Sequence, residues 1–418
     1  MRAALWLLAL FGIAVAVALF AGNNQGSVTL FWPPYRIDLS LNLVLLLLVA
    51  AFFLVHAAMR ALAALLELPR QALRWRTQQK ERAMHGALLD ALSHLLAGRY
   101  IRARKSAQAV LDQEGSLTGS GQEPANAEQL RAIAHLLAAE AAQALQDRPA
   151  RQQHLEAALE QASARDAQET RDGALLRAAR WALQDLDPET ALQLLQGLPQ
   201  GAARRTVALR TRLRASREAG QPLQALETAR LLAKHHAFSD IAARSILRGL
   251  ATDLLARAYD VAQLQRAWNT LEPAERLVPE VAIQAAQRLA DLRGDAATAR
   301  EWLLPAWEAQ AQLPQPLRVK LVCALEEGLD SIDAGWLARI EAAQRSNPRD
   351  ATLQYLAGMA CMKRQLWGKA QQLLTQAALG LQDPALHRRA WRALAELAEQ
   401  REDVSAAAEA WKRAAGES

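Results

Sequence analysis

An apolar run without a charged residue, Leu39 to Met59, limits what this chain can fold into more than any other feature. A second uncharged run, Ala3 to Ala21, precedes it. Each run has about the 20 residues that a helix needs to cross a bilayer. The sequence therefore predicts two transmembrane helices, over residues 3–21 and 39–59, within a membrane domain of residues 1–66.

Each run also has an alternative interpretation. The first is compatible with a cleaved signal peptide, because Arg2 precedes it and the small residues Ala18 and Ala21 lie near its end. Its apolar stretch is, however, longer than the roughly 7–15 residues that are usual in such peptides. The second run is compatible with a buried core helix, although its polar Asn42 and His56 lie only near its ends.

Basic residues gather on one side of the second run. Only Arg36 lies between the two runs, whereas the second is followed by Arg60, Arg70, Arg74, Arg76, Lys80 and Arg82. Because flanking Lys and Arg residues stay in the cytoplasm, the residues that follow are expected to be cytoplasmic and the loop 22–38 to face the opposite compartment. Residues 67–82 are expected to form a basic juxtamembrane linker. Its expected anchors at anionic headgroups are Arg70, Arg74, Trp75, Arg76 and Lys80.

The loop between the two runs has the pattern of a short hairpin. Val28 to Phe31 alternate in polarity and Pro33-Pro34 stop the run. Trp32 and Tyr35 suit the aromatic belt of a membrane interface. The pattern predicts an interfacial hairpin, and a strand that binds a partner is the alternative.

Residues 83–418 are predicted to form a cytoplasmic array of tetratricopeptide-like helical hairpins, so that the fold class is all-α. Aromatic residues make up only 5% of the chain, and Ala, Leu, Arg and Gln dominate, which favours helices over sheets. Turns at Gly98, Gly220 and Gly294 each separate two short amphipathic helices. Stacking of such hairpins buries apolar faces that no hairpin buries alone. Seven to nine hairpins are expected, and an unrelated helical bundle is the alternative.

Small residues mark the expected close helix crossings. The C-terminal unit has Trp391, Leu394 and Ala395 on its first helix, then Ala407, Trp411 and Ala414 on its second. The preceding unit has Gly358, Ala370, Leu374 and Ala377, and looser matches are Ala103, Ala191, Ala225, Ala267 and Ala299. Residues 113–127, rich in Gly, Ser, Pro and Asn, are expected to form a mobile loop or a lid.

Three arginines are expected to line a groove of this array. If Leu209 and Leu213 are buried, Arg210, Arg214 and Arg217 share one exposed helix face, and Arg180 of the preceding unit comes close. Guanidinium groups bind carboxylates, either in an acidic protein segment or in the propionates of a porphyrin. The alternative is a solvated face balanced by Glu218 and Glu227.

No catalytic or metal-binding motif is present, so no enzyme activity is expected. Cys323 and Cys361 form no CxxC pair and are expected to be buried. The eight histidines show no recognised ligand spacing; His235-His236 and His56 are the first to test for haem ligation. The net charge of +6 comes largely from the juxtamembrane residues, and no nucleic-acid-binding signature accompanies it.

The chain resembles the proteobacterial HemY family over nearly its whole length. The likeness is carried by two membrane helices around Gly26 to Trp32, GSVTLFW, then the basic linker and residues 84–107, MHGALLDALSHLLAGRYIRARKSA, which lead into the repeats. This resemblance implies an inner-membrane protein associated with the late steps of haem biosynthesis. The flavin-dependent protoporphyrinogen oxidase that shares the family's name is excluded, because no GxGxxG motif follows a strand.

The expected function is that of a non-enzymatic scaffold that binds late haem-biosynthesis enzymes at the lipid bilayer. The alternatives are a general envelope-assembly adaptor and a tetrapyrrole-binding carrier. No cofactor is expected other than, under the last alternative, haem or a porphyrin, and no nucleic acid is expected as a partner.

Overall fold

The structure is a computed structural model that describes residues 11–19, 22, 25–118, 126–162 and 167–416. It divides into two compact units, Met1–Ala167 and Gln168–Ser418. Each unit has its own hydrophobic clusters, and each is described separately below.

The first unit contains a two-stranded antiparallel hairpin. Strands β1 (Ser27–Trp32) and β2 (Tyr35–Ser40) pair from Ser27↔Ser40 at the base to Trp32↔Tyr35 at the tip. The amide of Leu41 donates a hydrogen bond of 2.8 Å to the carbonyl oxygen of Gly26, which closes the base. The hairpin predicted from the sequence is therefore present. It is the exception to an otherwise helical fold in the described residues.

Helix α2 (Leu41–Leu96) has 56 residues and starts directly after the hairpin. Its first part, Leu41–Ala63, has a mean hydropathy of 2.5 and no buried residue, so it is long and apolar enough to cross a membrane. Among the described residues it is the one helix with these properties. It corresponds to the second predicted span, although Leu39 and Ser40 belong to β2.

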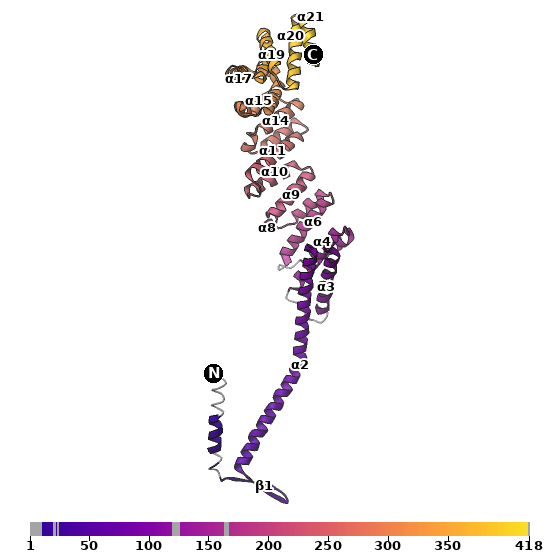
Figure 1. The fold of residues 1–418 in the computed structure, drawn as a ribbon, viewed down its shortest axis with the longest axis vertical. Coiled ribbons are helices and arrows are strands. Elements are labelled where there is room, and N and C mark those ends of the chain that lie inside the picture. The colour runs from indigo at the N-terminus through magenta and orange to yellow at the C-terminus, as the bar shows by residue number, and fades with distance from the viewer. Residues whose placement is uncertain (1–10, 20–21, 23–24, 119–125, 163–166, 417–418) are drawn as a thin grey trace. The chain divides into compact units, whose positions relative to one another are not determined.

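The first predicted span, residues 3–21, falls largely outside the described residues. Within it, residues 11–19 are helical and exposed. The predicted linker, residues 67–82, lies within α2, which continues without a break into the helical part of the unit (Figure 1). The side chains of residues 64–74 and 76–77 lie outside the described residues.

The C-terminal part of α2 packs with α3 (Tyr100–Thr118), and α4 (Ala127–Ala144) packs with both α3 and α5 (Arg148–Gln161). The residues buried between these helices include Met84, Ala91, Ala107, Val110 and Ala138. The four helices form two helical hairpins, α2–α3 and α4–α5, as the repeat pattern predicts.

The predicted loop 113–127 is shorter than expected, because Gln113 to Thr118 form the end of α3. Leu117 is buried, and the carboxylate of Glu114 lies 3.4 Å from Nε of Arg131 on α4. The burial of Leu117 and the ion pair of Glu114 stabilise the end of α3 in a sequence that is rich in Gly and Ser. Residues 119–125 lie outside the described residues.

The second unit is helical throughout its described part. Its main helices are α6 (Gln168–Gln184), α7 (Pro188–Gln196), α9 (Thr206–Glu218), α10 (Pro222–Lys234), α11 (Asp240–Ala256), α12 (Val261–Thr270), α14 (Pro279–Asp291), α15 (Ala296–Glu308), α16 (Gln315–Glu326), α17 (Ala334–Ser346), α18 (Ala351–Lys363), α19 (Trp367–Gly380), α20 (Pro384–Gln400) and α21 (Val404–Ala415). Short helical turns between them are α8 (Gln200–Ala203), α13 (Pro273–Arg276), η2 (Gln310–Gln312) and η3 (Leu329–Ser331).

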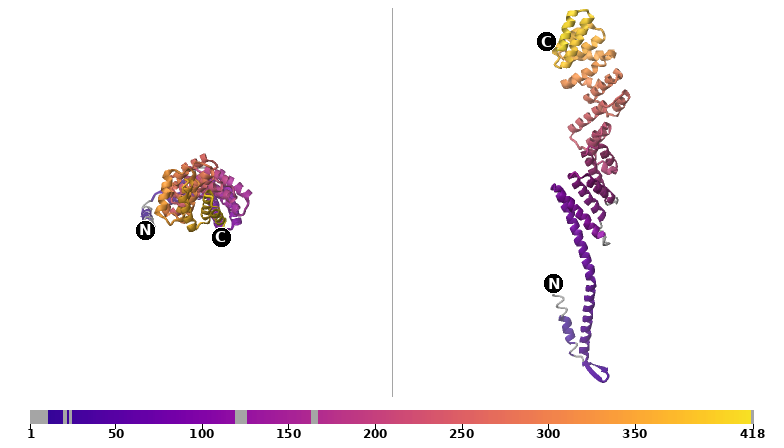
Figure 2. Two further views of the ribbon diagram at one scale, coloured as in Figure 1. Left: turned by 90° about the horizontal axis from the view of Figure 1, so that it is seen from above. Right: turned by 90° about the vertical axis from the view of Figure 1, so that its right-hand side faces the viewer.

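These helices form a stack of hairpins in chain order. Helices pair within hairpins such as α6–α7, α9–α10, α14–α15, α18–α19 and α20–α21, and the first helix of one hairpin packs on that of the next, as in α11–α14–α16–α18–α20. Figure 2 shows this succession within the unit by its colour change from magenta to yellow. The arrangement is an α-solenoid, and its middle is irregular because the short turns α13, η2 and η3 lie between successive helices there.

One turn recurs between the paired helices. A residue with positive φ, such as Gly220 (68°) or Leu186 (61°), is followed by a residue whose amide bonds to the carbonyl five positions earlier. Gln221 N to Ser216 O (2.8 Å) and Asp187 N to Ala182 O (2.9 Å) are examples. This geometry ends one helix and starts the next. Glycine occupies the positive-φ position at 98 and 220, whereas at the predicted turn near Gly294 it is occupied by Arg293.

The predicted small residues lie at close helix crossings. The alanines named above on the second helices of the hairpins are all buried, among them Ala103, Ala191, Ala225, Ala267 and Ala299. At Gly358 on α18, an added Cβ would lie 2.7 Å from Cγ of Leu374 on α19. The close approach of α18 and α19 therefore requires a glycine at position 358.

Candidate partner-binding pocket

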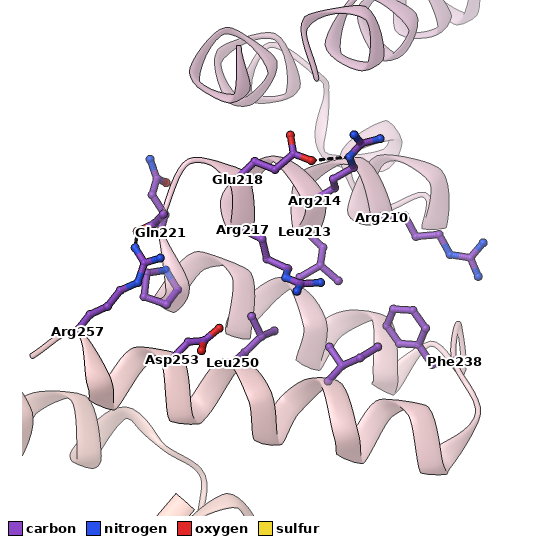
Figure 3. Close-up of a pocket in the computed structure, with 13 residues that line it drawn as sticks. Arg210, Leu213, Arg214, Arg217, Glu218, Gln221, Phe238, Leu250, Asp253 and Arg257 are labelled. Atoms are coloured by element: carbon purple, nitrogen blue, oxygen red, sulfur yellow. Dashed lines mark hydrogen bonds and ion pairs between the residues drawn. The ribbon is translucent and has the colours of Figure 1, made fainter. Parts of the chain in front are cut away.

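The arginine face predicted on residues 210–217 lines an open pocket in the second unit. The pocket has a volume of about 710 Å³ and lies between α9 and α11, with the α9–α10 turn at one end (Figure 3). Its lining comprises Arg210, Leu213, Arg214, Arg217, Glu218, Gly220, Gln221, Pro222, Phe238, Ile246, Leu250, Asp253 and Arg257. We call it the arginine pocket (Figure 3).

The amphipathic pattern of α9 explains why these arginines share one face. Leu209 is 2% exposed and Leu213 is 8% exposed, as the sequence predicts. With these two side chains against the core, positions 210, 214 and 217 point outward on adjacent helical turns. The solenoid then places α11 opposite that face.

The three arginines of α9 differ in how far they are already engaged. Nη2 of Arg210 donates to the carbonyl oxygen of Ala237 (2.9 Å), and Nε of Arg214 donates to Oε1 of Glu218 (2.7 Å). Within the described part of the chain, the guanidinium of Arg217 has no hydrogen-bond or ion-pair partner, whereas its backbone carbonyl oxygen accepts a hydrogen bond from Gly220 N at 3.1 Å. Its guanidinium points into the pocket towards Leu213 in Figure 3. Arg217 is therefore the cation of this face best placed to receive an anion.

The opposite wall was not predicted from the sequence. It comes from the next hairpin, where Ile246, Leu250, Asp253 and Arg257 lie on α11 and Phe238 precedes it. The spacing of Leu250, Asp253 and Arg257, at i, i+3 and i+7, is the sequence signal that places them on one helix face. Predicting the wall also requires knowing which helix follows α9 in the stack.

Arg257 closes one end of the pocket. Its Nη1 donates to the carbonyl oxygen of Gly220 at 2.7 Å, and so connects the end of α11 with the α9–α10 turn. Gly220 has a φ of 68°, and an added Cβ there would lie 2.7 Å from the same Nη1 atom. A glycine therefore allows both the turn and this contact.

The pocket combines positive charge with an apolar floor. Its lining includes the guanidinium groups of Arg210, Arg214, Arg217 and Arg257 and the carboxylates of Glu218 and Asp253. What we call the apolar floor is the set of nonpolar side chains Leu213, Phe238, Ile246 and Leu250, which come from both walls. Such a surface suits a ligand that has carboxylates next to an apolar group, because guanidinium groups bind carboxylates in a bidentate manner.

The other predicted site residues lie elsewhere. Arg180 is exposed on α6, which packs against α9, but it is not part of the pocket lining. Trp75 and Lys80 are exposed on α2. Arg70, Arg74 and Arg76 also belong to α2, and their side chains lie outside the described residues.

The histidines and cysteines singled out from the sequence are scattered. His235 and His236 are exposed in the turn after α10, and His56 stacks on Phe52 at 6.2 Å between ring centroids. Cys361 is buried, Cys323 is half-buried, and burial raises the pKa of both thiols. In the part of the chain that the structure describes, no group of three or more His, Cys, Asp or Glu residues is arranged to hold a metal ion.

The fold and the pocket define a helical-repeat protein that carries a helix able to cross a membrane. Residues 26–146 match the family model of the HemY protein N-terminus, which supports the resemblance of this chain to the HemY family. The match extends from the β1–β2 hairpin to the end of α4. This family is membrane-associated.

Solved structures of low similarity also match the chain. The APC/C hetero-tetramer Cut9–Hcn1 is 14% identical, with a TM-score of 0.29, and the match covers 78% of this chain and 65% of that one. The P58(IPK) TPR domain is 13% identical, with a TM-score of 0.23 and coverage of 76% and 99%. Naa15/Naa10 bound to HypK-THB is 13% identical, with a TM-score of 0.20 and coverage of 77% and 67%. This chain thus spans less than two thirds of the first of these chains, and no curated protein matches it.

Proposed function

We propose that the chain is a non-enzymatic scaffold of the bacterial inner membrane that binds enzymes of late haem biosynthesis. The observation that carries this proposal is the arginine pocket, an open and positively charged site on a stack of helical hairpins. Open grooves of this kind suit extended protein segments. The pathway itself comes from the resemblance to the HemY family.

The proposed topology has two membrane spans and a cytoplasmic repeat array. The second span is Leu41–Ala63, and the first covers residues 3–21. Arg70, Lys80 and the arginines between them follow the second span, which favours the cytoplasm for everything after it. The basic part of α2 then lies at the anionic headgroups.

The proposed ligand of the arginine pocket is an acidic segment of a partner enzyme with an apolar side chain beside its carboxylates. The carboxylates would reach Arg217 and Arg214, while the apolar side chain would cover Phe238 and Leu250. Membrane anchoring adds to this affinity, because it confines scaffold and enzymes to one thin layer and raises their effective concentration. Hydrophobic intermediates then pass between neighbouring enzymes with little escape.

Crosslinking in native membranes tests this proposal. The full-length chain and the double variant Arg214→Glu, Arg217→Glu are crosslinked at native expression, and the captured proteins are identified by mass spectrometry. Late haem-biosynthesis enzymes should be captured by the parent chain and lost in the variant. The matched control is Arg349→Glu, Arg392→Glu, which reverses the same number of exposed charges away from the pocket and should retain capture.

The outcomes test two points separately: whether the arginine pocket binds the partner, and whether the partners are haem-biosynthesis enzymes. Equal capture by both double variants would show that the arginine pocket does not bind the partner. Capture of envelope-assembly proteins in place of haem enzymes would favour a general adaptor instead.

A tetrapyrrole carrier is the second candidate. The pocket volume of about 710 Å³ lies within the usual range of small-molecule sites, and its apolar floor with basic rim suits a porphyrin with two propionates. Titration of the chain with protoporphyrin, followed by absorbance, tests it. Saturable binding that Arg217→Glu weakens and Arg349→Glu leaves intact would favour the carrier over the scaffold.

A further inference from the structure

The β1–β2 hairpin has one face made entirely of apolar side chains. In an antiparallel pair, residues opposite each other project to the same side, and the side alternates along each strand. The register places three cross-strand pairs on one face: Val28–Leu39, Leu30–Ile37 and Trp32–Tyr35. We call this the apolar face of the hairpin.

The other face is polar. It carries the pairs Ser27–Ser40, Thr29–Asp38 and Phe31–Arg36. The guanidinium of Arg36 lies 5.4 Å from the ring centroid of Phe31, and its Nε donates to Oδ1 of Asp38 at 3.4 Å. The one aromatic ring on this side is thus paired with a charged group that water solvates.

The apolar face is half-buried at its base, at Val28 and Leu39, and uncovered towards its tip. Trp32 and Tyr35 at the tip are each 71% exposed, and Leu30 and Ile37 are also exposed. An isolated two-stranded hairpin is only marginally stable in water. Such a face therefore needs a partner surface.

The position of the hairpin in the chain indicates which surface this is. Strand β2 ends at Ser40 and the candidate membrane span begins at Leu41, with no residue between them. The hydrogen bond from Leu41 N to Gly26 O ties the base of the hairpin to the first turn of that span. If α2 crosses the membrane, the hairpin is held where α2 leaves the bilayer, the depth at which Trp and Tyr side chains are enriched.

We infer that the apolar face of the hairpin lies in the lipid headgroup region of the leaflet at the N-terminal end of α2, with its polar face towards water. Lipid is the occupant because the face continues the apolar surface of the span and has no charged side chain. Trp32 and Tyr35 then anchor the hairpin along the membrane surface, and the hairpin fixes how α2 enters the bilayer. This inference depends on α2 crossing the membrane and is independent of any role in haem biosynthesis.

Neighbouring residues on opposite faces provide a matched test. Nitroxide labels are attached to Ile37→Cys and, separately, to Asp38→Cys in the full-length chain with Cys323 and Cys361 replaced by alanine. The protein is placed in nanodiscs of phosphatidylcholine and phosphatidylglycerol. Collision of each label with oxygen, which concentrates in lipid, and with a nickel chelate, which stays in water, is measured by power saturation. Labels at Leu45 in the span and Glu409 in the array are the lipid and water references.

The label at 37 should have an oxygen-to-nickel collision ratio several-fold higher than the label at 38. The label at 38 should resemble the water reference at 409. Three results would overturn the inference: equal water accessibility of both labels, protection of the 37 label from both reagents, as contact with protein would produce, or water accessibility of the label at 45.

Discussion

Nη1 of Arg257 donates a 2.7 Å hydrogen bond to the carbonyl oxygen of Gly220 and so joins two successive hairpins at one end of the arginine pocket. The contact connects the C-terminal end of α11 with the turn that ends α9. The pocket is therefore a property of the stack, because each hairpin alone supplies only one wall.

Replacement of Gly220 by alanine tests this junction. The positive φ of 68° disfavours a side chain, and the new Cβ would displace the guanidinium of Arg257. We expect the free energy of unfolding to fall by about 1–2 kcal/mol. The measurement is urea unfolding of residues 78–418, which retain Met84 and every later buried residue.

Gly249→Ala is the matched control for that substitution. Gly249 lies inside α11, and nothing lies within 4 Å of an added Cβ. Alanine is the better helix former by roughly 0.5–1 kcal/mol, so this variant should be stabilised. If both glycine variants gave the same change, the turn geometry at Gly220 would have no special cost.

Tyr355→Phe tests the polar contact between first helices of three hairpins. The buried Tyr355 on α18 donates from Oη to Oε1 of Glu326 on α16 at 2.6 Å, and Arg389 on α20 lies 2.9 Å from Oε2 of the same carboxylate. Loss of the hydroxyl should cost about 1–3 kcal/mol at neutral pH, because a hydrogen bond to a charged acceptor is lost.

The same variant has a predicted pH dependence. Burial, and next the carboxylate of Glu326, raise the pKa of Tyr355 above its ordinary value of 10.0. The unfolded chain therefore releases this proton first, so that the stabilisation is complete below pH 10.0 and is lost as the pH rises above it. Urea unfolding from neutral to alkaline pH should show a steeper loss of stability in the parent than in Tyr355→Phe. Parallel profiles would contradict the assignment.

The histidine pair of the first unit should make stability fall in mild acid. Nδ1 of His135 on α4 and Nδ1 of His154 on α5 are 3.1 Å apart. Burial lowers the pKa of both below 6.5; His154 and Arg131 add to the effect at His135. At His154, Arg104 adds to it and Asp147 opposes it.

Because the folded pKa values are depressed, the unfolded chain binds protons more readily than the folded chain. The stability of the pair is thus complete above pH 6.5 and is lost as the pH falls below it. Replacing both histidines with glutamine should flatten this slope in urea unfolding experiments. A slope unchanged by the double variant would refute the prediction.

Much of the architecture was predictable because it depends on local periodicity. Small residues such as Ala225 and Gly358 recur at helix crossings, and the buried Leu209 and Leu213 fix the arginine face of α9. The hairpin was predicted for the same reason, since strand alternation and Pro33-Pro34 are local signals.

What could not be predicted depends on contacts between distant segments. The α11 wall of the pocket comes from the next hairpin, and its Asp253 and Arg257 have no motif of their own. The helix through residue 118 depends on the contact of Glu114 with Arg131 on α4, which propensity does not register. The α11 wall and the end of α3 are therefore determined by how neighbouring hairpins stack, and the local sequence pattern does not show this.

In the proposed function, the repeat array acts on its partners while it is tethered to the membrane. The most direct measurement is the haem content of cells that lack the chain and carry one of three versions at native expression. These are the full-length chain, residues 78–418 alone, and residues 78–418 joined to an unrelated membrane helix with the same orientation. The full-length and re-anchored versions should restore haem, whereas the free array should not, since it must find each partner from bulk solution. Full restoration by the free array would contradict the tethered scaffold and favour a soluble binding or carrier role.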